Sequence, residues 1–128
     1  CSISQMAAKF ALDPKKTFLS EWIKQFEERK NFLIDFFDSI NEFEVINPEG
    51  AFYLFVGCEG FIQKKTPDGK IISNDVDFAE FILTDSKVAI VPGIAFGKSP
   101  YFRISYATSL DDLKLACEQI KNSISKIL

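Results

Sequence analysis

Apolar residues recur at helical spacing over the first third of the chain. Over residues 1–12 they return every three or four positions, and over residues 15–41 six of them lie on one stripe: Leu19, Ile23, Phe26, Leu33, Phe37 and Ile40. This period predicts a short helix and then a long amphipathic helix, with Asp13-Pro14 marking the break between them. Four more aromatic residues widen the apolar face of the long helix: Phe18, Trp22, Phe32 and Phe36. We therefore expect part of this face to meet a neighbouring part of a larger protein.

Short apolar runs predict strands in the rest of the chain. Residues 51–56 and 88–91 are apolar or aromatic throughout, and residues 101–106 are apolar or aromatic except for Arg103 and Ser105. Turn residues stand beside these runs. The segment that follows the first run, residues 57–74, is largely polar and contains glycine, proline and lysine. We expect it to form an exposed loop, with a small hairpin.

Capping residues predict two further helices. Asn74 or Asp75 can accept hydrogen bonds from the first turn of a short helix over residues 76–83. Ser109, with Asp112 three residues later, makes a variant of the capping box. The final helix that this box would begin has a regular set of apolar positions: Leu113, Ala116, Cys117, Ile120, Ile124 and Ile127.

The order of these elements predicts the α+β class. Strands alternate with helices, and several connections are too short for parallel crossovers. We expect a small, largely antiparallel sheet with helices packed on one side, preceded by the long amphipathic helix. A chain of 128 residues with 47% apolar residues suits a single domain with a real core. Within it, we expect leading helices over residues 1–41 and the α+β unit over residues 42–128.

Composition excludes several classes of function. The formal net charge is −3, and only two of the 15 basic residues are arginines, which argues against a nucleic-acid binder. No apolar run approaches the roughly 20 residues of a membrane span, and we expect neither a membrane helix nor a signal peptide in this sequence. Three scattered cysteines and no histidine argue against a disulfide framework and a metal site, and suit a cytoplasmic protein. The absence of histidine also removes the usual general base.

Arg103 is the residue best suited to bind an anion. Strand alternation places Arg103 on a polar face, opposite the face of Phe102 and Ile104. A guanidinium presents five donors in one plane, which matches a carboxylate or phosphate. The alternative is an arginine that extends from an edge strand into solvent, and the residue pattern by itself favours that alternative.

Two turns and one aromatic cluster are weaker candidates. Residues 91–97 contain two glycines, which could bring the backbone close to a ligand, but they lack a phosphate-loop pattern and are typical of an ordinary turn. The turn over residues 47–50 has the same ambiguity. Phe52, Tyr53 and Phe55 are expected in the core rather than on a stacking surface.

Three ordered motifs together resemble the carboxy-terminal part of class I aminotransferases, most closely the bacterial aspartate aminotransferases. The motifs are residues 47–53 (NPEGAFY), 88–97 (VAIVPGIAFG) and 102–109 (FRISYATS). Residues 2–5 (SISQ) and the insertion ending in residues 66–70 (TPDGK) are similar to the same branch. The resemblance therefore covers essentially the whole chain.

The resemblance implies a role for this chain. In that family a small domain closes over the substrate of a homodimeric, pyridoxal-phosphate-dependent enzyme, which transfers the amino group between L-aspartate and 2-oxoglutarate. The arginine of the last motif binds the substrate α-carboxylate, and Arg103 occupies its place. The resemblance also implies that Phe52, Gly93 and Ile94 lie on the substrate side.

The same resemblance implies what this chain lacks. The family's Schiff-base lysine and its cofactor-binding residues belong to a large domain that is absent from this chain. We therefore expect no catalytic residue and no pyridoxal phosphate site in this segment, and an isolated chain that is inactive. Two alternatives stay open: a stand-alone α+β binding or interaction domain without catalysis, and the small domain of a related aromatic or prephenate aminotransferase.

Overall fold

Helices and an antiparallel sheet make up the computed structural model, which describes residues 1–13 and 18–127. In chain order the elements are α1 (Ser2–Ala11), α2 (Phe18–Asp38), β1 (Glu44–Ile46), β2 (Tyr53–Gly57), α3 (Asp75–Ser86), β3 (Val91–Pro92), β4 (Tyr101–Ser105) and α4 (Leu110–Ile124). Two short 3-10 turns, η1 (Glu59–Phe61) and η2 (Gly93–Phe96), join them. The predicted α+β class is confirmed.

The sheet has the strand order β1-β2-β4-β3, and every neighbouring pair is antiparallel. Its inner face carries Leu54 and Val56 from β2, and Phe102 and Ile104 from β4, all of which are buried. Because side chains alternate along a strand, the residues between them point to the opposite, outer face. Arg103 is one of these outer residues.

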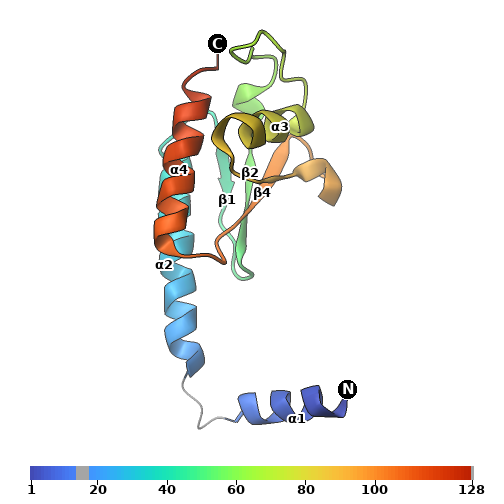
Figure 1. Cartoon of the computed structure of the whole chain (residues 1–128), viewed down its shortest axis with the longest axis vertical. Coiled ribbons are helices and arrows are strands. Elements are labelled where there is room, and N and C mark those ends of the chain that lie inside the picture. The colour runs from blue at the N-terminus through green and yellow to red at the C-terminus, as the bar shows by residue number, and fades with distance from the viewer. Residues whose placement is uncertain (14–17, 128) are drawn as a thin grey trace.

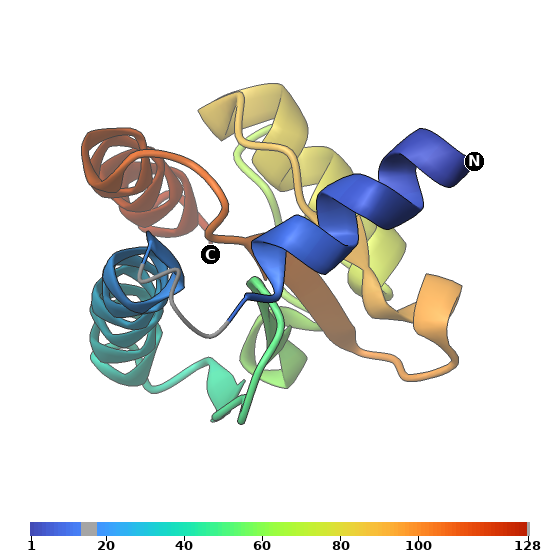
Figure 2. The same cartoon turned by 90° about the horizontal axis from the view of Figure 1, so that it is seen from below.

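Helices α2, α3 and α4 cover the inner face of the sheet, as predicted (Figures 1 and 2). Helices α2 and α4 lie side by side, and α3 contacts α4 and β4. Their buried apolar residues complete the core: Leu33 and Phe37 from α2, Phe78 and Ile82 from α3, and Leu113, Cys117 and Ile120 from α4. The outer face has no α-helix packed on it in the described part of the chain.

The strands differ from the prediction in three places. Strand β1 was not predicted, because three residues are too few to establish a period. Strand β2 begins at Tyr53 rather than residue 51, since Ala51 has a φ of 67°, outside the range of a strand. Residues 88–90 form no ladder, and only Val91 and Pro92 pair with β4. The apolar character of this run reflects partial burial and not strand pairing, because Val88 and Ile90 pack against the core.

The first turns of α2 and all of α1 are more exposed than the apolar stripe suggested, and Phe26 is the first stripe residue of α2 that packs against the core. Leu33 and Phe37 are fully buried, and the predicted extra aromatics Phe32 and Phe36 pack partly against the core. Trp22 and Ile23, one to two turns into α2, are 60% and 64% exposed. Residues 15–17 and the side chain of Phe18 lie outside the described residues.

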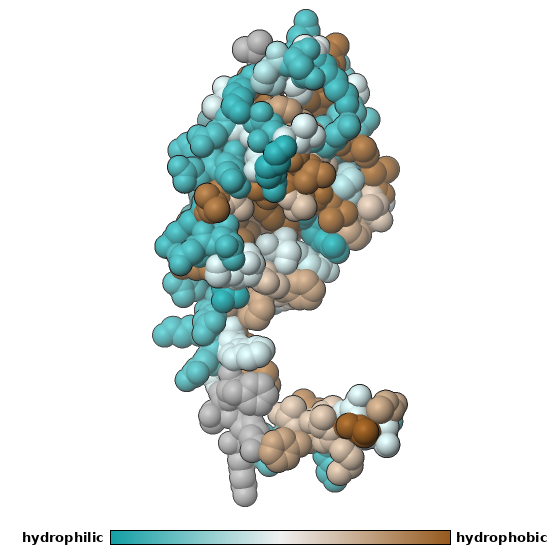
Figure 3. Space-filling model, in the orientation of Figure 1, coloured by the Kyte–Doolittle hydropathy of each residue, from teal (hydrophilic) through white to brown (hydrophobic). Residues whose placement is uncertain are grey.

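Helix α1 buries none of its residues and lies away from the sheet (Figure 1). Figure 3 shows apolar colouring over most of its visible surface. Its exposed apolar side chains are Ile3, Met6 and Phe10, and Leu12 follows them. A helix with this much apolar surface in solvent is typical of a segment that docks on something else.

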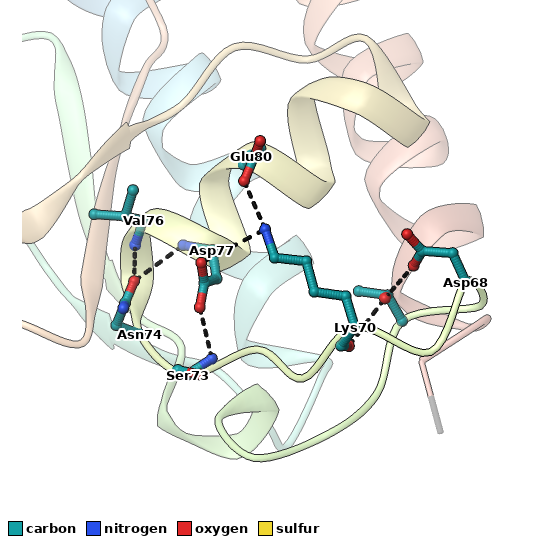
Figure 4. Close-up of polar contacts among 8 residues, drawn as sticks. Asp68, Lys70, Ser73, Asn74, Val76, Asp77 and Glu80 are labelled. Atoms are coloured by element: carbon teal, nitrogen blue, oxygen red, sulfur yellow. Dashed lines mark hydrogen bonds and ion pairs between the residues drawn. The ribbon is translucent and has the colours of Figure 1, made fainter.

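The hairpin between β2 and α3 is less exposed than predicted. Lys65 and Ile71 form an antiparallel bridge, and Thr66 and Ile72 are buried beside it. The ammonium of Lys70 lies 2.8 Å from a carboxylate oxygen of Glu80, which ties the hairpin to α3 (Figure 4). Most of the segment is therefore exposed, as its polar composition predicts, but Thr66 and Ile72 are buried and anchor it.

Both predicted helix caps are present. The side chain of Asn74 accepts hydrogen bonds from the backbone N–H groups of Val76 and Asp77, so Asn74, and not Asp75, caps α3 (Figure 4). The hydroxyl of Ser109 accepts from the backbone N–H of Asp112 at 3.1 Å, which begins α4. Helix α3 extends three residues past the predicted end.

Candidate anion-binding site

Arg103 lies in the middle of β4, between Phe55 on β2 and Val91 on β3. The half-buried side chain places its guanidinium carbon 5.0 Å from the centre of the Tyr53 ring and 4.7 Å from the centre of the Phe96 ring. Strand β4 is an inner strand of the sheet, so the edge-strand alternative for Arg103 is wrong. The two rings hold the guanidinium through cation–π contacts.

No carboxylate among residues 1–13 and 18–127 forms an ion pair with Arg103. A half-buried guanidinium without an acidic partner keeps its planar set of donors for another group. Carboxylates and phosphates match that plane through two parallel, charge-assisted hydrogen bonds. The surroundings of Arg103 therefore suit the binding of an external anion.

The other predicted site residues surround Arg103 less directly. Phe52, the residue before β2, is about half exposed, with its ring centre 5.4 Å from that of Tyr53. Gly93 is buried in η2, while the side chain of Ile94 is exposed. Gly93 and Ile94 belong to η2, and the contact between η2 and the Arg103 guanidinium is made by Phe96.

The residues that touch the guanidinium, Tyr53 and Phe96, were not selected from the sequence. Tyr53 and Phe55 were expected in the core, and Phe52 with them. The structure instead leaves Phe52 about half exposed and places Tyr53 and Phe55 half-buried on the outer face. Strand parity was the available signal, because Tyr53 and Phe55 alternate with the buried Leu54 and Val56. No local signal pointed to Phe96.

The turn over residues 93–99 is tightly closed. A Cβ atom on Gly93 would lie 2.2 Å from the backbone oxygen of Lys98 and 2.7 Å from that of Tyr101. Gly97 has a φ of 78°, a left-handed conformation that favours glycine. Both glycines are therefore required by the path of the turn, and Phe96 stands between them.

Tyr101 continues the row of aromatic rings that starts at Phe96 beside Arg103 and runs through Phe55. Its ring stacks on Phe55 with centres 5.2 Å apart, and its hydroxyl donates to a carboxylate oxygen of Glu44 at 2.7 Å. That hydrogen bond raises the pKa of Tyr101 above its ordinary value, because it favours the neutral phenol. Tyr101 thus acts as a neutral donor, and Arg103 remains the group suited to an anion.

The two buried cysteines are not activated thiols, and no metal centre is formed among the described residues. Burial raises the pKa of both Cys58 and Cys117 to about 12, so these thiols stay protonated near neutral pH. Within the described residues, no group of three or more histidine, cysteine, aspartate or glutamate side chains could hold a metal ion. None of the described helices is long and apolar enough to cross a membrane.

Pyridoxal phosphate would need a lysine held in a desolvated or electrostatically altered environment. Among the described lysines none is buried, and only Lys30 and Lys64 are even half-buried. The residues described here therefore do not fit a complete site for that cofactor, although Arg103 fits a carboxylate.

Comparisons with known proteins agree with the motifs. A family model described as aminotransferase class I and II matches residues 1–120. The chain is 46% identical over 127 residues to the probable aspartate/prephenate aminotransferase of Rickettsia felis, and this match covers 99% of the chain and 31% of that protein. It is also 46% identical over 126 residues to the aspartate aminotransferase of Rhizobium meliloti, a match that covers 98% of the chain and 31% of that enzyme.

A solved structure shows the same fold. The crystal structure of the aspartate aminotransferase from Rhizobium meliloti superposes with a TM-score of 0.94 at 45% sequence identity, over 99% of this chain and 32% of that one. The chain thus spans about a third of the length of the relatives it matches. The motifs, the fold and the family match agree, and the chain belongs to the class I and II aminotransferases.

Proposed function

We propose that this chain is the substrate-closing small domain of a pyridoxal-phosphate-dependent aspartate aminotransferase. The full-length protein, meaning the longer protein to which the chain would belong, transfers the amino group between L-aspartate and 2-oxoglutarate as a cytoplasmic homodimer. Its cofactor is held by a large domain outside this chain. The names of the relatives support the substrate class, and the division into leading helices over residues 1–41 and an α+β unit over residues 42–128 is part of the proposal.

The observation that carries the proposal is the guanidinium of Arg103, held between Tyr53 and Phe96 without an acidic partner among the described residues. We assign Arg103 to the α-carboxylate, a group that the amino acid and the oxo acid share. Two parallel hydrogen bonds would fix the orientation of the substrate as well as its position. The test is an amino-transfer assay of the full-length protein with and without the Arg103→Lys substitution.

A second candidate concerns the amino acceptor. The name of the Rickettsia felis relative includes prephenate. The rings of Phe96, Phe55 and Tyr101, which lie beside Arg103, offer apolar contact to an oxo acid that carries a ring. Comparing kcat/KM for 2-oxoglutarate and prephenate in the full-length protein separates the two substrates.

The isolated chain is expected to fold cooperatively without binding pyridoxal phosphate covalently. Its core is continuous, but none of the described lysines is buried, so burial makes none of these amines unusually reactive. Mixing the chain with the cofactor and reducing with borohydride should give only low, scattered labelling, measured by mass spectrometry. The same chain in urea is the matched control, since it has the same lysines. Stoichiometric labelling of one lysine in the folded chain alone would contradict the proposal and favour a stand-alone activity.

The exposed apolar faces of α1 and the first half of α2 are proposed to dock on the large domain. Without that domain, Met6 and Ile23 are 65% and 64% exposed, and we expect the isolated chain to self-associate at high concentration. Sedimentation equilibrium should show this association, and Met6→Lys and Ile23→Lys should weaken it. Leu115→Lys is the control, because Leu115 is 54% exposed on α4, away from these faces. A strictly monomeric chain whose Trp22 fluoresces as a buried residue would count against the docking surface.

A further inference from the structure

A buried carboxylate lies outside the site described above. Asp75 is the first residue of α3 and is 1% exposed. Its two oxygens accept hydrogen bonds from the backbone N–H of Ile94 at 2.7 Å and from the hydroxyl of Ser99 at 2.6 Å. Because Asn74 caps α3, the carboxylate of Asp75 is not needed for capping.

These two hydrogen bonds hold both ends of the turn over residues 93–99. Inside the turn, the backbone N–H of Gly97 donates to the backbone oxygen of Ile94 at 3.0 Å. The backbone N–H of Lys98 donates to the backbone oxygen of Gly93 at 3.2 Å. Phe96 lies between the two residues that Asp75 binds, and its ring is the one 4.7 Å from the Arg103 guanidinium. Asp75 is thus connected to Arg103 through one short turn.

We propose that Asp75 is a positioning residue for substrate binding, because it holds the turn that keeps Phe96 against Arg103. This inference rests on the proposed function of Arg103. Hydrogen bonds to a buried carboxylate are strong, since water does not compete for the oxygens. A turn fixed in this way presents Arg103 in one geometry before the substrate arrives, which reduces the ordering that binding requires.

A positioning role and a purely structural role of Asp75 predict different losses of activity toward different substrates. If Asp75 acts through Arg103, its removal should harm only ligands that carry an α-carboxylate. If Asp75 only stabilises the domain, all ligands should be affected alike. β-Alanine separates the two cases, because it is L-aspartate without the α-carboxylate.

The experiment uses the full-length protein with the substitutions Asp75→Ala, Asp75→Asn and Ser99→Ala. Asp75→Ala removes both hydrogen bonds, and we expect KM for L-aspartate to rise about tenfold or more, with a smaller change in kcat. The kcat/KM for β-alanine should stay within about twofold of wild type. Asp75→Asn should recover most of the affinity, because its amide oxygen can accept from Ile94 and its NH₂ can donate to the Ser99 hydroxyl.

Asn74→Ala is the matched control. It removes the cap of α3 one residue away, so it should lower stability and leave KM for L-aspartate unchanged. In an Arg103→Lys background, Asp75→Ala should add little to the rise in KM, because both changes act on the same contact. If Asp75→Ala fails to fold, Ser99→Ala decides, since Ser99 is exposed and its loss removes one hydrogen bond.

Two results would overturn the inference. One is an equal loss for β-alanine and L-aspartate, and the other is an unchanged KM for L-aspartate in Asp75→Ala, or in Ser99→Ala if the first does not fold. Failure of the proposed function is distinct, because it would show as an unaffected Arg103→Lys enzyme. An impaired Arg103→Lys enzyme with normal Asp75 and Ser99 variants would leave the proposed function intact and remove only the positioning role.

Discussion

Arg103→Lys in the full-length protein should lower kcat/KM for L-aspartate by about 30-fold to several thousand-fold. Loss of a buried, charged hydrogen-bond pair costs roughly 2 to 5 kcal/mol, and this range of free energy converts to that range of rates. Lysine keeps the positive charge but offers a single point of contact, so the substrate loses orientation as well as affinity. We expect kcat and KM both to change, as measured by steady-state kinetics with varied L-aspartate.

Arg29→Lys is the matched control for this prediction. Arg29, the other arginine of the chain, also lies over an aromatic ring, with its guanidinium carbon 5.5 Å from the centre of Phe26. It is on α2, away from the outer face of the sheet, and its replacement should change kcat/KM by less than about twofold. The pyridoxal phosphate content of both variants should equal that of wild type. A fall of less than about threefold for Arg103→Lys would assign Arg103 a structural role only.

Phe37→Ala should lower the free energy of unfolding of the 128-residue chain by about 3 to 5 kcal/mol. Phe37 is fully buried, and its ring centre lies 4.9 Å from that of Phe36, 5.1 Å from Phe43 and 5.7 Å from Phe102. The substitution removes apolar contact and leaves a cavity where α2 meets the sheet. Since the free energy of unfolding of a domain is only about 5 to 15 kcal/mol, this loss would remove a large part of the chain's stability.

Urea denaturation followed by circular dichroism measures this change through the transition midpoint. Phe10→Ala is the control with the same change of residue, because Phe10 is 66% exposed on α1. It should cost about 1 kcal/mol or less. A loss below about 1 kcal/mol for Phe37→Ala would show that the aromatic cluster refills the cavity.

The predictable part of the fold was the part with a regular period. The helices of the first third, the cap at Ser109 and the strand that carries Arg103 were all predicted, because each depends on residues that are close in sequence. The two failures have different causes. Strand β1 is too short to show a period, whereas residues 88–90 were predicted as a strand from their apolar run. A run of apolar residues shows that a segment is buried, but pairing depends on a strand that lies elsewhere in the chain.

The candidate site divides in the same way. The sequence by itself determined that Arg103 faces away from the core, because strand alternation follows from backbone geometry alone. It could not determine that β4 is an inner strand, or that Tyr53 and Phe96 flank the guanidinium, because both depend on strand order and register between distant segments. Likewise, Asn74 and Asp75 were equal candidates for one cap, and only the tertiary structure assigned Asp75 to the turn over residues 93–99. The reason is physical: a cap is satisfied within one turn of helix, whereas a buried carboxylate is satisfied by whichever donors the folded chain brings to it.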